Sequence, residues 1–205
     1  MTLTQEIRDA ASIILLRNEL ELPQILMGKR DGNAVFMPNK YVFPGGSLDP
    51  IDFEVPFNSN HQIWNYEKLS IQTDKDLGQP LVNCALRELE EETGIGIKPN
   101  DLQDYTMGFI LRAITPPGMT RRFDTRFFLC RISEKIESSQ MNCFGNASGE
   151  LSELHWFDLQ EALHLDLAAI TRNVILFVNE IFDQGMELNR LPFYREGSFE
   201  ELTFI

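Results

Sequence analysis

The stretch 81-LVNCALRELEEETGIGI-97 constrains this 205-residue chain most, because it is both helical in pattern and crowded with acid. Val82, Ala85, Leu86 and Leu89 recur at the i, i+3, i+4, i+7 spacing of an amphipathic helix. Gly94 stands where a glycine ends a helix. We therefore predict a helix over 81–93 with its apolar face in a core.

The same helix gathers carboxylates on one side. Glu88, Glu91 and Glu92 are spaced i, i+3, i+4 and fall within about 100° of one another, whereas Glu90 lies apart as a surface charge. Like charges at this spacing cost a few tenths of a kcal/mol each, and more when partly desolvated. Two interpretations stay open: a solvated acidic face, or a site for a hard divalent cation such as Mg²⁺ or Mn²⁺.

Other segments predict an α/β fold. Strands at 11–17 and 24–29 read as a hairpin across 18–23, and 41–43 is a short strand entering a turn at Pro44-Gly45-Gly46. Further strands are predicted near 102–113, 123–132 and 151–157, with a second amphipathic helix at 167–182. We expect a mixed sheet between helices in a single domain, 1–205. Residues 53–79 read as an insertion or lid outside the core, and 133–150 as a loop. The chain ends in a C-terminal helix and tail at about 166–205, of which the tail 186–205 has no clear period.

Composition excludes some classes of partner. The net charge of −13 disfavours non-specific binding to nucleic acid or to anionic membranes. Three cysteines without CxxC spacing indicate free thiols in a reducing compartment. The N-terminus lacks the basic region of a signal peptide, and no apolar run approaches the roughly 20 residues that span a bilayer. We expect a cytoplasmic protein.

The acidic helix also matches a family motif. Residues 87–95, RELEEETGI, fit every position of R-E-U-x-E-E-x-G-U, where U is aliphatic; this is the second half of the Nudix box. The first half places an acid six residues after a glycine, and Gly46 is followed at that spacing by Asp52 in place of Glu. The box spaces that acid and the arginine by seven residues, but here 53–86 intervene. The chain resembles the Nudix hydrolases, with an insertion at about 53–79 inside the box.

The resemblance reaches a subgroup. The runs 36-FMPNKYVFPGG-46 and 120-TRRFDTRFFLC-130, with Asp49 and Asp52, look like the Nudix hydrolases related to peroxisomal coenzyme A diphosphatases. The shorter coenzyme A signature of other Nudix branches is not evident. The subgroup implies coenzyme A or an acyl-CoA as substrate. The wider family also implies an ADP-ribose, a dinucleotide or a nucleotide sugar.

The resemblance assigns roles to residues. Glu91 and Glu92 would be the main metal ligands, and Glu88 a third ligand or the base that activates water. Arg87 would orient the glutamates by ion pairing. The carbonyl of Gly46 would meet the metal, since a side chain there would obstruct the approach. Such a cluster supports Mg²⁺- or Mn²⁺-assisted cleavage of a diphosphate without a nucleophilic Ser or Cys.

Further candidates each keep a structural alternative. Glu150, six residues before Trp156, is preferred to Glu153 as an additional catalytic acid. The alternative is that Glu150 is a surface charge without a catalytic role. Arg121 and Arg122 follow a Pro-Pro-Gly turn and are candidates to bind substrate phosphate, against a solvated turn. Other residues are expected to have structural roles. Asp124 is expected to pair with an arginine, and Phe57, Trp64 and Tyr66 to anchor a lid rather than to stack on a base. The histidines His61, His155 and His164 are too scattered along the sequence to predict a metal site.

Two classes of function follow. The first is an enzyme that hydrolyses the diphosphate of a small nucleoside diphosphate derivative. The second is a catalytically idle Nudix-fold sensor that binds nucleotides; the three box glutamates argue against it, whereas Asp52 and the split box argue for it. A second copy of the chain is a further candidate partner, with 53–79 as a lid, a dimer arm or neither.

Overall fold

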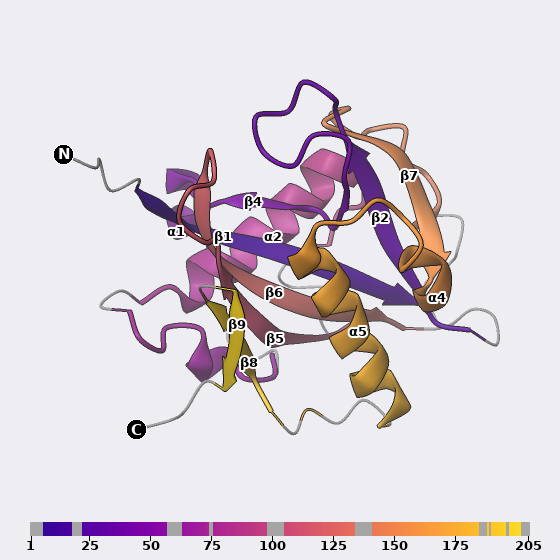
Figure 1. Ribbon diagram of the computed structural model, residues 1–205. Coiled ribbons are helices and arrows are strands. Elements are labelled where there is room, and N and C mark those ends of the chain that lie inside the picture. The colour runs from indigo at the N-terminus through magenta and orange to yellow at the C-terminus, as the bar shows by residue number, and fades with distance from the viewer. Residues whose placement is uncertain are drawn as a thin grey trace.

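A nine-stranded mixed sheet organises the chain, as predicted (Figure 1). The computed structural model describes residues 6–17, 22–56, 63–73, 76–97, 105–133, 141–184, 188, 190–195 and 197–201. The strands are β1 (Ile7–Arg17), β2 (Gln24–Arg30), β3 (Tyr41–Val42), β4 (Gly45–Ser47), β5 (Tyr105–Ile114), β6 (Arg122–Ile132), β7 (Leu151–Asp158), β8 (Pro192–Arg195) and β9 (Ser198–Glu201). The helices are α1 (Pro50–Glu54), η1 (Tyr66–Lys68, a 3-10 turn), α2 (Gly78–Thr93), α4 (Leu159–Ala162) and α5 (Ala169–Asp183).

Strand β1 is the centre of the sheet. It pairs antiparallel with β2, which confirms the predicted hairpin, and parallel with β6 over residues 7–16. On the same edge, residues 16 and 17 of β1 pair with β2, whereas residues 10–12 pair antiparallel with β4, with Ala11 opposite Gly46. Residues 10–16 are buried on both faces, so β1 reads as a continuous apolar run rather than an alternating one.

Helices cover both faces of the sheet. Figure 1 shows α2 behind the central strands and α5 in front of them. The apolar face of α2 packs on one side of the sheet and that of α5 on the other, which gives two separate core clusters. Both predicted helices are therefore confirmed. Gly94 ends α2 with a φ of 77°, and its N–H bonds to the carbonyl of Glu90, as the predicted glycine cap requires.

The prediction that 53–79 lies outside the core is wrong for part of this segment. Ile63, Leu69 and Leu77 are 6%, 1% and 0% exposed and belong to the cluster beneath α2. Trp64 exchanges backbone hydrogen bonds with β5, at Met107 and Phe109, so it anchors the segment. The sequence did not predict this burial, because single apolar residues separated by polar neighbours form no periodic pattern. Residues 57–62, 74 and 75, which include Phe57 and His61, lie outside the described residues. The prediction of a lid or dimer arm therefore stays untested.

The C-terminal tail, expected to be irregular, adds two strands. β8 runs parallel to β5, with Ala113 opposite Tyr194, and β9 folds back antiparallel onto β8. Phe193 is 2% exposed and packs in the α2-side core, while Tyr194 packs on the α5 side. Four-residue strands are too short for period-2 patterning to predict. Among the described helices, none is long and apolar enough to cross a membrane.

Candidate functional site

Strand β4 brings the glycines of the split box against α2. The sequence predicted a turn at Gly45-Gly46, but both residues lie in a strand that pairs with β1. The Sγ of Cys84 on α2 lies 3.5 Å from the carbonyl oxygen of Gly46. A Cβ at Gly46 would lie 2.2 Å from Oε1 of Glu88 and would push that flexible carboxylate aside. The contact agrees with the expectation that a side chain at Gly46 would obstruct the site.

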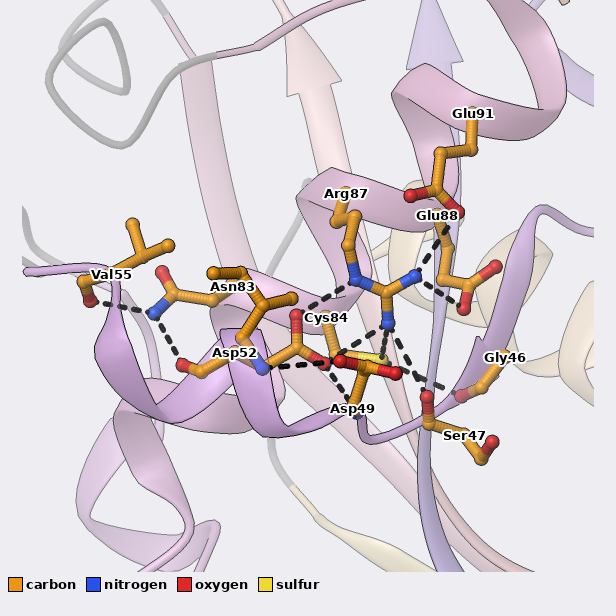
Figure 2. Close-up of polar contacts among 11 residues, drawn as sticks. Gly46, Ser47, Asp49, Asp52, Val55, Asn83, Cys84, Arg87, Glu88 and Glu91 are labelled. Atoms are coloured by element: carbon orange, nitrogen blue, oxygen red, sulfur yellow. Dashed lines mark hydrogen bonds and ion pairs between the residues drawn. The ribbon is translucent and has the colours of Figure 1, made fainter. Parts of the chain in front are cut away.

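The two halves of the box meet through one ion pair. Arg87 donates from Nε to Oδ1 of Asp52 at 2.9 Å and from Nη2 to Oδ2 at 3.0 Å (Figure 2). Asp52 is 1% exposed and also closes a capping box at the start of α1 with Asp49. Asn83 of α2 donates to the backbone carbonyls of Asp52 and Val55. The shorter acid therefore reaches the arginine in bidentate geometry across the insertion.

Arg87 also reaches the glutamates. Its Nη1 lies 2.8 Å from Oε1 of Glu88 and 3.2 Å from Oε2 of Glu91, and Figure 2 shows both carboxylates turned toward the guanidinium. Glu90 is exposed on the outer side of α2, as predicted. Arg87 thus holds Asp52 on one side and two glutamates on the other. This arrangement agrees with the orienting role expected of it.

Glu92 is the buried acid of the group. It is 2% exposed, and its Oε2 accepts a hydrogen bond from the N–H of Gly45 at 2.9 Å. Burial raises the pKa of Glu92 to about 8 and outweighs that hydrogen bond, which lowers it. Burial also raises the pKa of Glu88, against the lowering effect of Arg87. Carboxylates this close, and this desolvated, call for a compensating positive charge.

One hollow surface joins these acids. A recess of about 320 Å³ is lined by Glu88, Glu91, Glu92, Asn146, Ser148 and Glu150. The N–H of Ser148 bonds to the carbonyl of Glu91 at 2.7 Å, which fixes the 141–150 loop beside α2. Glu153 lies elsewhere, hydrogen-bonded to Tyr41 and 3.0 Å from Nζ of Lys29. Of the two acids weighed from sequence, Glu150 is the one placed with the box glutamates.

The donor set fits a hard divalent cation. Side-chain carboxylates and a glycine carbonyl supply only oxygen, the ligand type that Mg²⁺ and Mn²⁺ favour. Within the described part of the chain, no three His, Cys, Asp or Glu side chains already converge as a finished metal site. The reason is visible at Arg87, which Glu88 and Glu91 face.

A larger cavity of about 550 Å³ adjoins the recess. It contains the box glutamates and extends over the α5 side of the sheet, between the loops 31–40 and 115–121. These loops meet where Thr120 donates to the carbonyl of Val35. Beside this contact, Phe36 packs edge to face at 5.2 Å on Phe123, near the start of β6. The cavity wall is only slightly more apolar than polar, and its lining includes three arginines and four glutamates. A concave site that combines apolar surface with placed charges is suited to a small molecule.

The arginines divide between cavity and scaffold. Arg121 lines the cavity, but Arg122 is absent from its wall and donates from Nε to the carbonyl of Thr115 at 2.9 Å. The position of Arg122 therefore lends no support to the substrate contact predicted for it. Arg8 and Arg30, which the sequence did not single out, also line the cavity. Arg30 ends β2, and its Nε is buried without a hydrogen-bond partner among the described residues.

Comparison with known proteins decides the family. The NUDIX domain family model matches residues 6–177. This chain belongs to the Nudix family. Hydrolases of the family typically use divalent metal ions. A Caenorhabditis elegans relative, "Putative nudix hydrolase 7", is 27% identical over 190 residues, which cover 78% of this chain and 54% of that protein. The chain thus spans about half the length of that curated Nudix relative.

Solved structures share the fold. A NUDIX hydrolase from Alicyclobacillus acidocaldarius superposes with a TM-score of 0.63 at 22% identity, covering 91% of this chain and 99% of that one. The NUDIX domain of Shewanella oneidensis NrtR, solved with ADP ribose, superposes with a TM-score of 0.53 at 15% identity, covering 87% and 90%. At these identities the likeness establishes the Nudix fold alone.

The Gly46 contact yields a prediction. Gly46→Ala is expected to displace Glu88, because the new methyl would overlap its carboxylate, and to lower the hydrolytic rate on the order of 10²-fold, as a misplaced reacting group does. Gly145→Ala is the matched control, since a Cβ there meets nothing within 4 Å. Steady-state kinetics with circular dichroism as a folding check measures the effect. Equal activity in the two variants would show that Glu88 has no catalytic position to lose.

Proposed function

We propose that this chain hydrolyses the diphosphate bond of a nucleoside diphosphate linked to another group, with Mg²⁺ or Mn²⁺ held by Glu88, Glu91, Glu92 and the carbonyl of Gly46. One observation carries the proposal: these three glutamates and Glu150 border a single recess that opens into a cavity of ligand size. A surface acidic patch needs neither the burial of Glu92 nor the bidentate Arg87–Asp52 pair behind it.

The chain's own groups then have separate tasks. When bound, the cation neutralises phosphate oxygens and lowers the pKa of water. Glu88, whose pKa burial raises, is our candidate to accept the proton of the attacking water, with Glu150 as the second candidate. Arg87 keeps the glutamates in place, and Arg121, which lines the same cavity, is our candidate to bind a phosphate of the substrate. We do not propose Arg122 as a substrate-binding residue, because its guanidinium donates to the backbone carbonyl of Thr115.

The subgroup resemblance makes coenzyme A or an acyl-CoA the first choice of substrate. Cleavage gives 4′-phosphopantetheine, or its acyl form, and adenosine 3′,5′-bisphosphate. An ADP-ribose, a dinucleotide or a nucleotide sugar is the alternative, and the ADP ribose bound by the structurally similar NrtR domain supports including it in the test. We further propose that residues 1–205 act as one cytoplasmic domain on a small molecule, not on nucleic acid or membrane, alone or as a homodimer.

A substrate screen tests the function. We expect metal-dependent release of a phosphomonoester from at least one of coenzyme A, ADP-ribose, NADH, diadenosine polyphosphates or nucleotide sugars, with Mg²⁺ or Mn²⁺. Glu91→Gln should lower that rate roughly 10²- to 10³-fold, the usual effect of removing one electrostatic group from a site. Turnover that Glu91→Gln keeps would overturn the site assignment. Binding of a compound without turnover would favour the idle sensor.

A further inference from the structure

The cavity has a floor that runs far from the glutamates. Five strands contribute one residue each to a row in register: Ser47, Ala10, Thr125, Ala113 and Tyr194. All five line the cavity. Strands lie about 4.8 Å apart, so the four steps from β4 to β8 span about 19 Å. The side chains of the alanines and the threonine are small, so they leave space above the sheet. Tyr194 forms the far end of the row and belongs to β8, which follows the family match at 6–177.

Helix α5 presents its N-terminus to the same cavity. Residues 168–171 all line it, and the helix that follows has 15 residues. Ala168 at the N-cap offers no side-chain acceptor, and the N–H groups of 169, 170 and 171 form no hydrogen bond to any residue in the described ranges. Free N–H groups and the helix dipole favour a negative charge at this position.

Thr171 supplies an independent sign of a missing ligand. Its side chain lines the cavity although the residue is only 5% exposed. Its hydroxyl makes no hydrogen bond to the part of the chain that the structure describes, and it is not among the fully enclosed polar atoms without a partner, so it is open to the cavity. The hydroxyl is a donor in the first turn of α5, the same turn whose backbone N–H groups lack acceptors.

Positive side chains complete the match to an anion. Arg8 and Arg121 line the cavity, are exposed, and form no ion pair with any described residue. The carboxylates, by contrast, gather at the recess beside α2. The cavity therefore has an acidic part, which suits cations and the diphosphate they carry, and a donor-rich part at α5, which suits an anion directly.

We propose that the first turn of α5, with Thr171 Oγ1 and with Arg8 and Arg121 of the same cavity wall, is a second anion subsite that binds a phosphomonoester of the substrate. This proposal rests on the proposed function, since it concerns the same cavity. It narrows the substrate class to nucleoside diphosphate derivatives that carry an additional phosphate away from the cleaved bond. Binding at this subsite needs no metal.

Matched ligand pairs test the subsite without turnover. Dissociation constants are measured in EDTA for coenzyme A against 3′-dephospho-coenzyme A, and for NADPH against NADH. We expect the phosphorylated member of at least one pair to bind roughly 10- to 100-fold more tightly, the range of one or two charge-assisted hydrogen bonds. Because catalysis is not measured, this result stands even if no compound is hydrolysed, so the two proposals fail separately.

Variants locate the preference. Thr171→Val removes the hydroxyl at constant volume and should cut the preference at least threefold, while Thr171→Ser should retain it. Thr106→Val, at an exposed position of β5 outside the cavity, is the control and should bind like the unmodified protein. Equal binding within both pairs overturns the subsite. So does a preference that Arg121→Gln abolishes and Thr171→Val leaves intact, because the phosphate would then bind to arginine alone.

Discussion

Asp124→Ala is expected to lower the free energy of unfolding by about 3–5 kcal/mol, as breaking a buried ion pair does. Asp124 accepts hydrogen bonds from Nε and Nη2 of Arg112 at 2.8 and 2.6 Å, and its Oδ1 lies 3.1 Å from Nη1 of Arg126. Arg126 is 0% exposed, and Asp9 is the other acid that pairs with it among the described residues. Removing Asp124 leaves two interior guanidiniums short of a counter-charge.

The same network fastens the insertion to the sheet. Nη1 of Arg112 donates to the carbonyl of Ile71 at 2.7 Å, so losing Asp124 also frees a guanidinium that ties the 63–73 segment to the sheet in addition to Trp64. Urea unfolding measures the loss, and Glu54→Ala, at an exposed position of α1, should stay within about 0.5 kcal/mol of the unmodified protein. Comparable stabilities for Asp124→Ala and Glu54→Ala would mean that hydration by water, not pairing with Asp124, stabilises the charges of the two arginines.

Glu92→Gln is expected to lower the hydrolytic rate roughly 10²- to 10³-fold while the protein stays folded. Glutamine keeps the volume and an oxygen that accepts from the N–H of Gly45, but it cannot neutralise a cation. Glu90→Gln, two positions away on the exposed side of α2, removes the same charge and should leave the rate unchanged. A similar loss in both variants would indicate a general electrostatic effect rather than a metal ligand.

The pH dependence of the stability of the metal-free protein should show whether Glu92 is desolvated. Burial raises the pKa of Glu92 from 4.5 to about 8, so the folded state holds a proton between these values that the unfolded chain has lost. This stabilising contribution is complete below pH 4.5 and is lost as the pH rises toward 8. In EDTA, the Tm of Glu92→Gln minus that of the unmodified protein should therefore increase between about pH 5 and pH 8. A constant difference would show that Glu92 is not desolvated.

Local patterns predicted the regular elements. The i, i+3, i+4, i+7 spacing gave α2 because one face of that helix is buried, and the same spacing showed that Glu90 points away from Glu88 and Glu91. The parallel pairing of β1 with β6 follows from no local pattern, because it joins residues more than a hundred positions apart. The box halves could be aligned by spacing, but only the fold shows Arg87 and Asp52 in contact.

The cavity was the least predictable part of the site. Its wall combines β1, β5, β6, the first turn of α5 and a C-terminal strand, each from a different region of the sequence. Thr171 carries no motif, and the sequence marked its helix only as core packing. Arg122 shows the converse limit: Arg121 precedes β6 and lines the cavity, whereas Arg122 begins β6 and donates to a backbone carbonyl, so adjacency to the same turn did not distinguish the two.

Direct binding of Mn²⁺ tests the central claim, that the carboxylates of α2 hold the catalytic cation. Protein freed of metal by EDTA and dialysis is titrated with Mn²⁺, and free Mn²⁺ is followed by electron paramagnetic resonance. We predict equal affinity for the unmodified protein and Glu90→Gln, and at least about tenfold weaker binding for Glu92→Gln, given that even supporting groups around a metal contribute that much. Equal Mn²⁺ affinity in all three proteins would contradict the account.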